Sequence, residues 1–178
     1  DPACGCGNFL IVSYREIRRL EIEVMKEIYD PNQPQLDLDV NYLSLVTVDQ
    51  FFGIEINHFA TRIAKIALWL VDHQMNMELS DIFGKSFVRI PIHDTKKVVV
   101  KNALGFDWND LIKSKECSYI VGNPPFVGSR LMTEKQKTDL KEIFGSGKNS
   151  GELDYVSCWF YKAGQYIKDS NTKVAFVS

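Results

Sequence analysis

Two spacings of apolar residues alternate along the chain, and together they predict an α/β fold. Four segments show helical periodicity or helix caps and predict helices, at residues 8–29, 57–77, 133–144 and 153–167. Four short apolar runs predict buried strands, at residues 51–56, 98–101, 118–121 and 173–177. Because helices and strands largely alternate, we expect one domain with a mostly parallel sheet and helices on both faces.

Capping residues predict where the helices begin. Asn8 and Asn57 are expected N-caps, and Thr133 with Gln136 fits a capping box. Loops are expected at residues 30–41, 80–95 and 145–151, and a short helix at 108–112. The side chains expected to be buried are Phe59, Ile63, Ile66, Ala67, Trp69, Leu70, Val71 and Met75 in the second helix, and Tyr155, Val156, Trp159, Phe160 and Ala163 in the last.

One stiff turn carries the candidate chemistry, the sequence Asn-Pro-Pro-Phe at residues 123–126. Two consecutive prolines fix φ and remove two backbone donors, directly after an expected strand. The Asn123 side-chain oxygen and the Pro124 carbonyl can accept hydrogen bonds from a planar amine, which would make its nitrogen more tetrahedral and more nucleophilic. Phe126 can stack on a planar substrate. Taken alone, the tetrapeptide is equally compatible with a plain Pro-Pro turn in a loop.

A glycine-rich turn at residues 1–8 leads into the first helix. Gly5 and Gly7 let the backbone approach a ligand, and the amino end of the helix supplies N–H groups and a favourable dipole. The turn fits either a dinucleotide fold or a structural role, because Leu10 stands where Gly-x-Gly-x-x-Gly requires its third glycine. No Gly-Lys-Ser/Thr sequence follows a glycine-rich loop between strand and helix, which argues against a P-loop.

Two polar residues follow expected strands and are candidates for cofactor contacts. Glu55 lies at the carboxyl end of the strand at 51–56, where a carboxylate can accept two hydrogen bonds from a ribose diol. An exposed strand-end charge is the alternative, and the glycine-rich turn favours the ribose. Asn102 can hydrogen-bond the edge of an adenine ring, or it can simply form a turn; Asp107 is the other polar candidate nearby.

Composition limits the partners, the metal sites and the cellular compartment that we expect for this domain. The net charge of −2 over 178 residues argues that this piece does not hold nucleic acid by itself. Its four cysteines lack zinc-finger spacing, so we expect reduced thiols, no metal site and a cytosolic protein. We see no signal peptide and no apolar run long enough to cross a membrane. The chain opens inside a motif without an initiator methionine, so we expect a piece of a longer protein.

The motifs resemble, in order and over essentially the whole chain, those of amino-group DNA methyltransferases that use S-adenosylmethionine. Residues 1–10 resemble motif I, 52–56 motif II, 102–104 motif III, 123–126 motif IV, 153–155 motif V and 174–178 motif VI. The residues that flank these motifs resemble those of the MmeI-like branch of combined restriction-modification enzymes (types IIG and IIL) and related phage-defence methyltransferases. The resemblance implies a truncated, Rossmann-like class I methyltransferase fold.

The resemblance also implies a role for each matching residue. Asp1 and the turn from Ala3 to Gly7 would hold the methionine part of S-adenosylmethionine, while Glu55 would bind the ribose and Ile56 would pack on adenine. The full set of implied cofactor contacts is Asp1, Pro2, Ala3, Cys4, Gly5, Gly7, Phe9, Glu55, Ile56, Asn102, Ala103 and Asn123. The implied catalytic residues are Asn123, Pro124, Pro125 and Phe126, which would hold a flipped adenine for methylation at N6.

The sequence remains compatible with several functions. Protein-glutamine and RNA amino-group methyltransferases use a similar tetrapeptide, and a fragment can be an inactive cofactor-binding module. The resemblance implies an adenine-specific, site-specific DNA methyltransferase that acts on duplex DNA in a bacterium or archaeon. Target recognition, and a nuclease if the parent has one, would lie outside residues 1–178.

Overall fold

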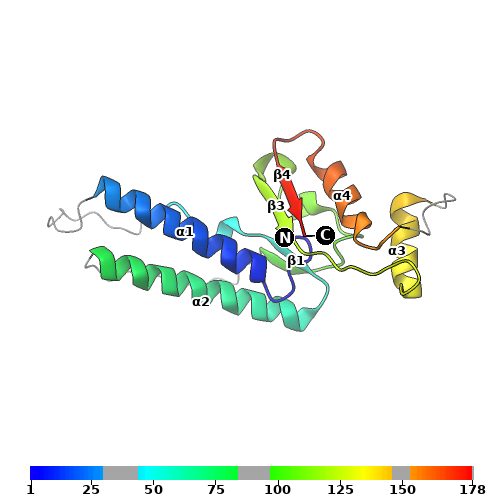
Figure 1. Cartoon of the computed structure of the whole chain (residues 1–178), viewed down its shortest axis with the longest axis horizontal. Coiled ribbons are helices and arrows are strands. Elements are labelled where there is room, and N and C mark those ends of the chain that lie inside the picture. The colour runs from blue at the N-terminus through cyan, green and yellow to red at the C-terminus, as the bar shows by residue number, and fades with distance from the viewer. Residues whose placement is uncertain (30–43, 84–96, 146–152, 178) are drawn as a thin grey trace.

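The computed structural model describes residues 1–29, 44–83, 97–145 and 153–177, and these form an α/β fold (Figure 1). The helices are α1 (Asn8–Ile28), α2 (His58–Phe83), α3 (Glu134–Phe144) and α4 (Ser157–Ile167). The strands are β1 (Gly53–Glu55), β2 (Val98–Val100), β3 (Tyr119–Gly122) and β4 (Lys173–Phe176). Of the loops expected at 30–41, 80–95 and 145–151, residues 30–41, 84–95 and 146–151 lie outside the described residues.

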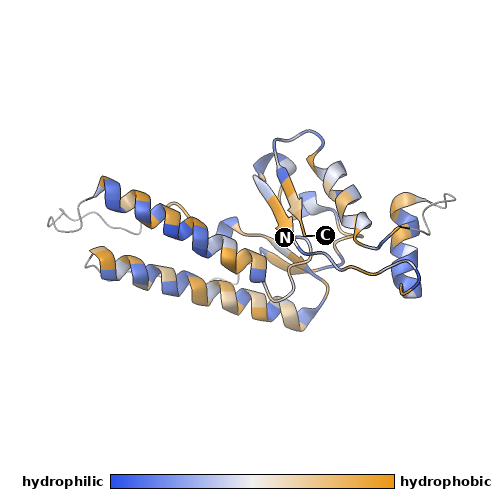
Figure 2. Ribbon diagram, viewed as in Figure 1, coloured by the Kyte–Doolittle hydropathy of each residue, from blue (hydrophilic) through white to orange (hydrophobic). Residues whose placement is uncertain are grey.

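The described strands form two parallel pairs rather than one continuous sheet. Strand β1 pairs with β2, and β3 pairs with β4. All four strands are predominantly apolar, as Figure 2 shows for β3 and β4. The prediction of parallel strands is therefore confirmed, while the single sheet is not formed by the described residues, since none of their strands joins β1 to β3.

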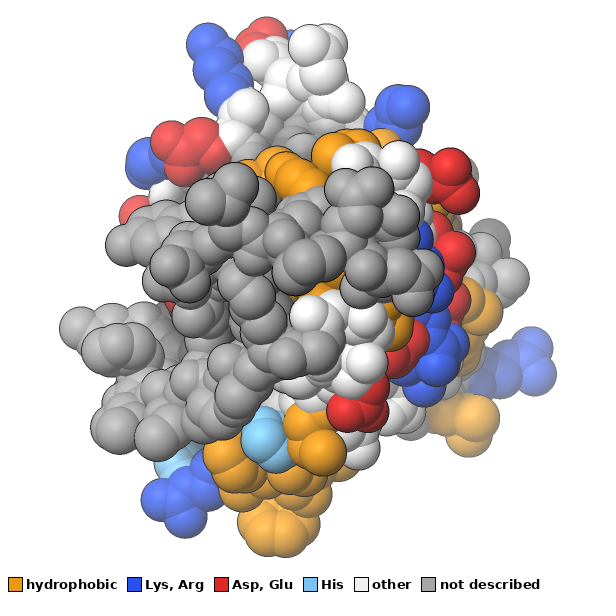
Figure 3. All heavy atoms as spheres, turned by 90° about the vertical axis from the view of Figure 1, so that its left-hand side faces the viewer, with side chains coloured by type: hydrophobic (Ala, Val, Ile, Leu, Met, Phe, Trp, Pro, Cys, Tyr) orange, Lys and Arg blue, Asp and Glu red, His pale blue; other side chains and the backbone are white. Residues whose placement is uncertain are grey.

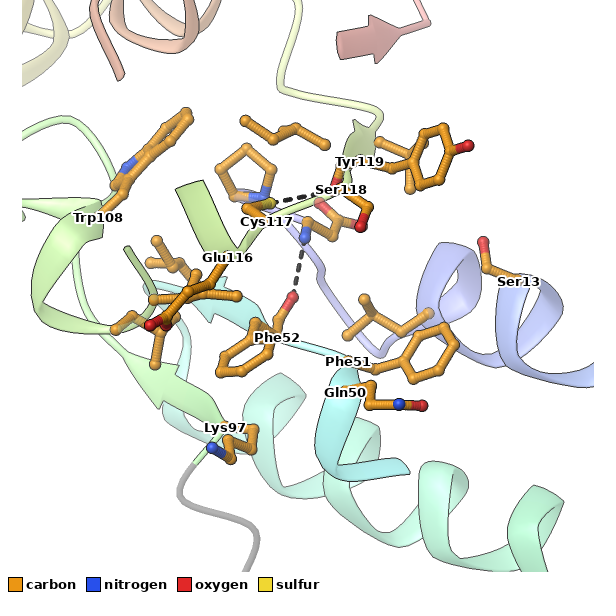
Figure 4. A pocket seen from close by; sticks show the side chains of 18 of the residues that line it. Ser13, Gln50, Phe51, Phe52, Lys97, Trp108, Glu116, Cys117, Ser118 and Tyr119 are labelled. Carbon is orange, nitrogen blue, oxygen red and sulfur yellow. Dashed lines mark hydrogen bonds between the residues drawn. The ribbon is translucent and has the colours of Figure 1, made fainter. Parts of the chain in front are cut away.

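A groove of about 720 Å³ separates the two strand pairs, and Figure 4 shows its lining. Phe52 and Ile54 line one side, and residues 118–121 of the β3 edge line the other. Asp1 lies in this groove beside β1: its backbone N donates to the Phe52 carbonyl at 2.8 Å, and its carbonyl accepts from the Ile54 N–H at 2.9 Å. These two bonds reproduce the hydrogen-bond pattern of a parallel strand.

Helices cover both faces of the β1–β2 pair, as predicted. Successive strand residues point to opposite faces. Gly53 faces Cys4 and Leu10, on the side where α2 packs and where α1 lies on α2. The next residue, Ile54, belongs to the cluster that contains Trp159 of α4. No helix in the described segments is long and apolar enough to cross a membrane.

The apolar face expected for α2 is wrong in part. Val71 and Met75 are buried as predicted. The side chains that the structure leaves exposed, by 36–71%, are Phe59, Ile63, Ile66, Trp69 and Leu70. The helix instead buries a stripe that includes Thr61, Ala64, Asp72 and Asn76. Apolar residues occur all around this helix, so the side that contacts α1 and the strands, and not hydrophobicity alone, decides which stripe is buried. Figure 3 shows apolar side chains gathered beside the histidines of this helix.

Two of the three predicted helix caps are confirmed. Asn57 Oδ1 accepts from the Phe59 and Ala60 N–H groups at 2.8 and 3.2 Å, and Thr133 forms its capping box with Gln136. Asn8 is not a cap; it is the first helical residue, and Gly7 in a left-handed conformation precedes it.

Three other local predictions need correction. Helix α2 continues past Met77 to Phe83, so it takes in the first residues of the loop expected at 80–95. Phe160, expected to be buried, is 43% exposed, and its ring makes an edge-on contact with Phe176 of β4. The short helix expected at 108–112 is a 3-10 turn, Trp108–Asp110.

Candidate functional site

The predicted catalytic turn follows β3 directly and presents its polar group to solvent. Asn123 is exposed, and its amide makes no hydrogen bond to any of the residues that the structure describes. Pro124 is fully buried, which anchors the turn, while Phe126 is 50% exposed. The turn therefore holds a free amide and an open aromatic face on a rigid base, as an amine-binding turn requires.

Hydrogen bonds from a neighbouring segment fix the residue after this turn. The Val127 N–H donates to Asp154 Oδ1 at 3.2 Å, and the Val127 carbonyl accepts from the Tyr155 N–H at 3.1 Å. Both partners precede α4 immediately. Residues 153–155 resemble motif V, and in the structure Asp154 and Tyr155 of this segment support the Asn-Pro-Pro-Phe turn.

The glycine-rich turn is closely packed at one glycine and open at the other. Gly5 and Gly7 both have positive φ, 54° and 90°. A Cβ atom at Gly7 would come within 3.0 Å of Ala64 Cβ, so this glycine lets α1 approach α2. A Cβ atom at Gly5 would meet nothing within 4 Å. The space around Gly5 is thus available to a ligand, whereas Gly7 has a packing role.

Glu55 joins the glycine-rich turn to the start of α2. Its Oε2 accepts from the Gly5 N–H at 2.9 Å, and its Oε1 accepts from the Asn57 N–H at 2.7 Å. Each carboxylate oxygen keeps further acceptor capacity after one hydrogen bond. Ile56, the next residue, is 57% exposed. A fixed carboxylate next to an exposed aliphatic side chain suits a ribose with an attached ring.

Asn102 begins a loop that is held from three sides. Its Oδ1 accepts from the Leu104 N–H at 3.1 Å, and its Nδ2 lies 3.4 Å from Asp139 Oδ1 on α3. The Leu104 carbonyl accepts from Lys162 Nζ at 2.6 Å, and burial lowers the pKa of this lysine. The turn-forming role considered for Asn102 is therefore observed, and it leaves the second lone pair of Oδ1 unused.

The structure brings the candidate cofactor turn next to the candidate catalytic turn. A Cβ atom at Gly122 would lie 2.6 Å from Asp1 Oδ1, so a side chain before Asn123 would displace the Asp1 carboxylate. The same Asp1 oxygen accepts from the Ala3 N–H at 3.0 Å. From the other side, Trp159 Nε1 donates to the Pro2 carbonyl at 3.2 Å. Residues far apart in the chain thus meet at the carboxyl ends of β1 and β3.

The remaining predicted site residues differ in accessibility. Cys4 is 5% exposed and Ala103 is 5% exposed, so both shape the site from within the core. Burial raises the pKa of the Cys4 thiol to about 11. Pro125 is exposed, and Phe9 and Ala3 are partly buried. Asp107 lies apart from this group, where it caps the 3-10 turn by accepting from the Asn109 N–H.

Sequence reasoning missed Asp139 and Lys162, both of which contact the Asn102 loop. Neither carries a local signal, because each is a charged residue on a helix that is expected to be amphipathic. In the described parts of the chain, no group of three or more His, Cys, Asp or Glu side chains could hold a metal ion. All four cysteines are free thiols.

Comparisons with known proteins identify the family of this chain. The whole chain, residues 1–178, matches the family described as "MmeI, DNA-methyltransferase domain". It is 41% identical over 181 residues to DNA methyltransferase A of Bacillus subtilis (strain 168), which covers 100% of this chain and 20% of that protein. It is 51% identical to the type IIL restriction-modification enzyme MmeI, solved in complex with DNA, with a TM-score of 0.91.

The match to the MmeI structure covers 99% of this chain and 23% of the MmeI chain. The chain thus spans about a fifth of the length of these two relatives. The family match nevertheless extends over all of its residues, and the motif-bearing turns lie where the strands end. The chain belongs to the family of MmeI DNA-methyltransferase domains.

Proposed function

We propose that this domain transfers a methyl group from S-adenosylmethionine to the N6 amino group of an adenine flipped out of duplex DNA. The domain would act within a longer restriction-modification or phage-defence enzyme. Recognition of the DNA sequence would lie in other parts of that protein, because the net charge of this chain is −2. The four free thiols favour a cytoplasmic setting in a bacterium or archaeon.

We also propose that the complete domain has a Rossmann-like class I methyltransferase fold. Asp1 already makes the two hydrogen bonds of a parallel strand with Phe52 and Ile54. The groove beside it is bounded by β1 on one side and β3 on the other. A strand that entered the glycine-rich turn at Asp1 would therefore join the two pairs into one parallel sheet.

The contact between Asp1 and Gly122 carries this proposal. It brings the turn that would hold the methionine part of the cofactor within van der Waals distance of the residue before Asn123. Methyl transfer needs donor and acceptor held in line at close range. A cofactor turn and an amine-binding turn that touch each other meet this requirement.

Three residues of the Asn-Pro-Pro-Phe turn would each have a role in the reaction. Bound S-adenosylmethionine would supply a methyl group on a sulfonium, which is already an activated electrophile. Asn123 Oδ1 and the Pro124 carbonyl would accept the two N–H groups of the target amine and favour an attacking lone pair. Phe126 would stack on the flipped base. Attack by the lone pair of the amine would form the N–C bond while the C–S bond breaks, S-adenosylhomocysteine would leave, and the amine would lose one proton during or after the transfer. Positioning and electrostatics would provide most of the rate.

A tritium-transfer assay on the full-length protein tests the proposal. The protein is incubated with S-adenosylmethionine labelled in the methyl group and, separately, with duplex DNA, tRNA or cell protein, and the labelled product is digested and identified. We expect label in N6-methyladenine from DNA. Label in RNA or in glutamine would overturn the DNA-adenine assignment, and absence of label in every substrate would overturn the enzymatic role of the domain.

A further inference from the structure

Asp139 on α3 connects two parts of the candidate site through its two carboxylate oxygens. Its Oδ2 accepts from the Tyr155 hydroxyl at 2.6 Å. Its Oδ1 lies 3.4 Å from Asn102 Nδ2, a long contact that leaves room for a stronger partner. Tyr155 is 6% exposed, and burial followed by the hydrogen bond to Asp139 raises the pKa of its phenol. The phenol therefore stays protonated and holds the carboxylate in a fixed orientation.

These contacts determine which way the Asn102 amide is turned. The Leu104 N–H is a donor and needs the amide oxygen, while the Asp139 carboxylate is an acceptor and needs the amide nitrogen. Both neighbours thus select the same orientation. Without the carboxylate, only the Leu104 N–H at 3.1 Å would oppose a flip of the amide.

We infer that Asp139 is a positioning residue that makes the cofactor site select a 6-amino purine over a 6-oxo purine. This inference rests on the proposed S-adenosylmethionine site, with Asn102 at its purine end. A 6-amino group donates hydrogen bonds, and it would meet the unused lone pair of Asn102 Oδ1 next to a carboxylate that can only accept. A 6-oxo group is itself an acceptor, and it would leave these oxygens unpaired or repelled.

The same aspartate also links the purine end of the site to the catalytic turn. Tyr155 donates its hydroxyl to Asp139 and its backbone N–H to the Val127 carbonyl, one residue beyond Phe126. A continuous set of hydrogen bonds therefore runs from Asn102 through Asp139 and Tyr155 to Val127. A cofactor with the correct purine would be held by the same contacts that support the substrate turn.

Ligand discrimination by the full-length protein tests this role. Isothermal titration would measure the dissociation constants of S-adenosylhomocysteine and of its 6-oxo analogue, S-inosylhomocysteine. We expect the wild type to prefer the adenosyl ligand and Asp139→Asn to lower that preference about tenfold, the usual effect of a hydrogen bond to a charged group. Tyr155→Phe, which keeps the carboxylate but removes its anchor, should lower the preference less. Glu142→Gln is the matched control, because Glu142 is exposed on the same helix.

The outcomes separate the inference from the proposed function. Equal weakening of both ligands by Asp139→Asn, with an unchanged ratio, would show a merely structural aspartate and overturn the inference while the cofactor assignment stands. A folded wild-type protein that binds neither ligand would overturn both. If Asp139→Asn does not fold, the ratio measured for Tyr155→Phe decides: a reduced preference supports the inference, and an unchanged one contradicts it.

Discussion

The α1–α2 pair holds a buried polar cluster, whereas the polar groups at the site end of the molecule are partly or fully exposed, and the two sets differ in how many hydrogen bonds they make. Within the described residues, Arg18 Nε is the buried side-chain atom of the first cluster that lacks a partner. Between the helices, Arg18 is fully buried and bonds to Glu21 at 2.5 Å, to Asn76 at 2.9 Å and to Ser44. Asp72 accepts from Asn76 at 3.3 Å and from the Tyr14 hydroxyl. At the site, Asn102 reaches Asp139 only at 3.4 Å, and Asn123 has no partner among the described residues.

This difference distinguishes polar side chains that stabilise the fold from polar side chains that are available to bind a ligand. Buried charges are tolerated only when paired, and removal of one partner is costly. The acceptors of the helix-pair cluster are used within that cluster: Glu21 and Asn76 accept from Arg18, and Asp72 accepts from Tyr14 and Asn76. The site cluster keeps unused acceptors at the carboxyl ends of the strands, where ligands bind in open α/β sheets. We therefore expect changes in the first cluster to affect stability and changes in the second to affect ligands.

The largest expected effect comes from breaking the paired cluster. Arg18→Met in the full-length protein should destabilise the α1–α2 pair by about 3–5 kcal/mol, because Glu21 would lose its buried counter-charge and Asn76 Oδ1 would lose its donor. Hydrogen exchange followed by mass spectrometry would show this as faster exchange in peptides from the two helices. Arg19→Met is the control, since its ion pair with Glu16 is half-exposed and worth little. Similar exchange in both variants would contradict the distinction.

The second effect is on the rate of methyl transfer and not on the affinity for the cofactor. Asn123→Ala should lower the methyl-transfer rate by about 2.7–4 kcal/mol, that is 10²–10³-fold, as for loss of a group that stabilises a transition state. The dissociation constant of S-adenosylhomocysteine should hardly change, because the Asn123 amide makes no hydrogen bond to the glycine-rich turn or to any other described residue. Rate assays and titration calorimetry would measure the two quantities. Asn171→Ala, an exposed amide beyond α4, is the control. Equal loss of cofactor affinity would contradict the role given to Asn123.

A third, smaller effect concerns the cofactor turn. Glu55→Gln should weaken S-adenosylhomocysteine binding roughly 10- to 100-fold, because hydrogen bonds to a charged acceptor are worth about 1.5–3 kcal/mol. The amide could accept from Gly5 or from Asn57, but its NH₂ group would face the other N–H. Glu78→Gln, exposed on α2, is the charge-matched control. Unaltered affinity would place the ribose elsewhere.

The smallest effect is a difference between two cysteines of the same turn. Cys6 is exposed, whereas Cys4 is 5% exposed with a pKa raised by burial to about 11. Iodoacetamide at neutral pH should therefore modify Cys6 at least about tenfold faster than Cys4, since only the thiolate reacts. Reaction at Cys4 should increase only as the pH approaches 11. S-Adenosylhomocysteine should slow the modification of Cys6 severalfold, as measured by peptide mass spectrometry. Unchanged labelling of Cys6 would argue against a ligand beside Gly5.

The sequence by itself determined most of the local structure and indicated which residues form the candidate site. The capping residues Asn57 and Thr133 lie at their helix starts, and the strands lie within or close to the predicted runs. These features depend on neighbours in the chain, so short patterns predict them well. The order of the motifs was likewise sufficient to indicate the family, which the comparisons confirm.

Only the tertiary structure decided which faces are buried and which residues support the site. Helix α2 buries Thr61 and Asp72 rather than Phe59 and Ile66, because α1 offers polar partners and a close approach on that side. Asp139 contacts Asn102 across 37 residues of chain, and Trp159 reaches Pro2 across 157. Contacts of this kind leave no periodic or local trace, because they form only when distant segments pack together in the folded chain.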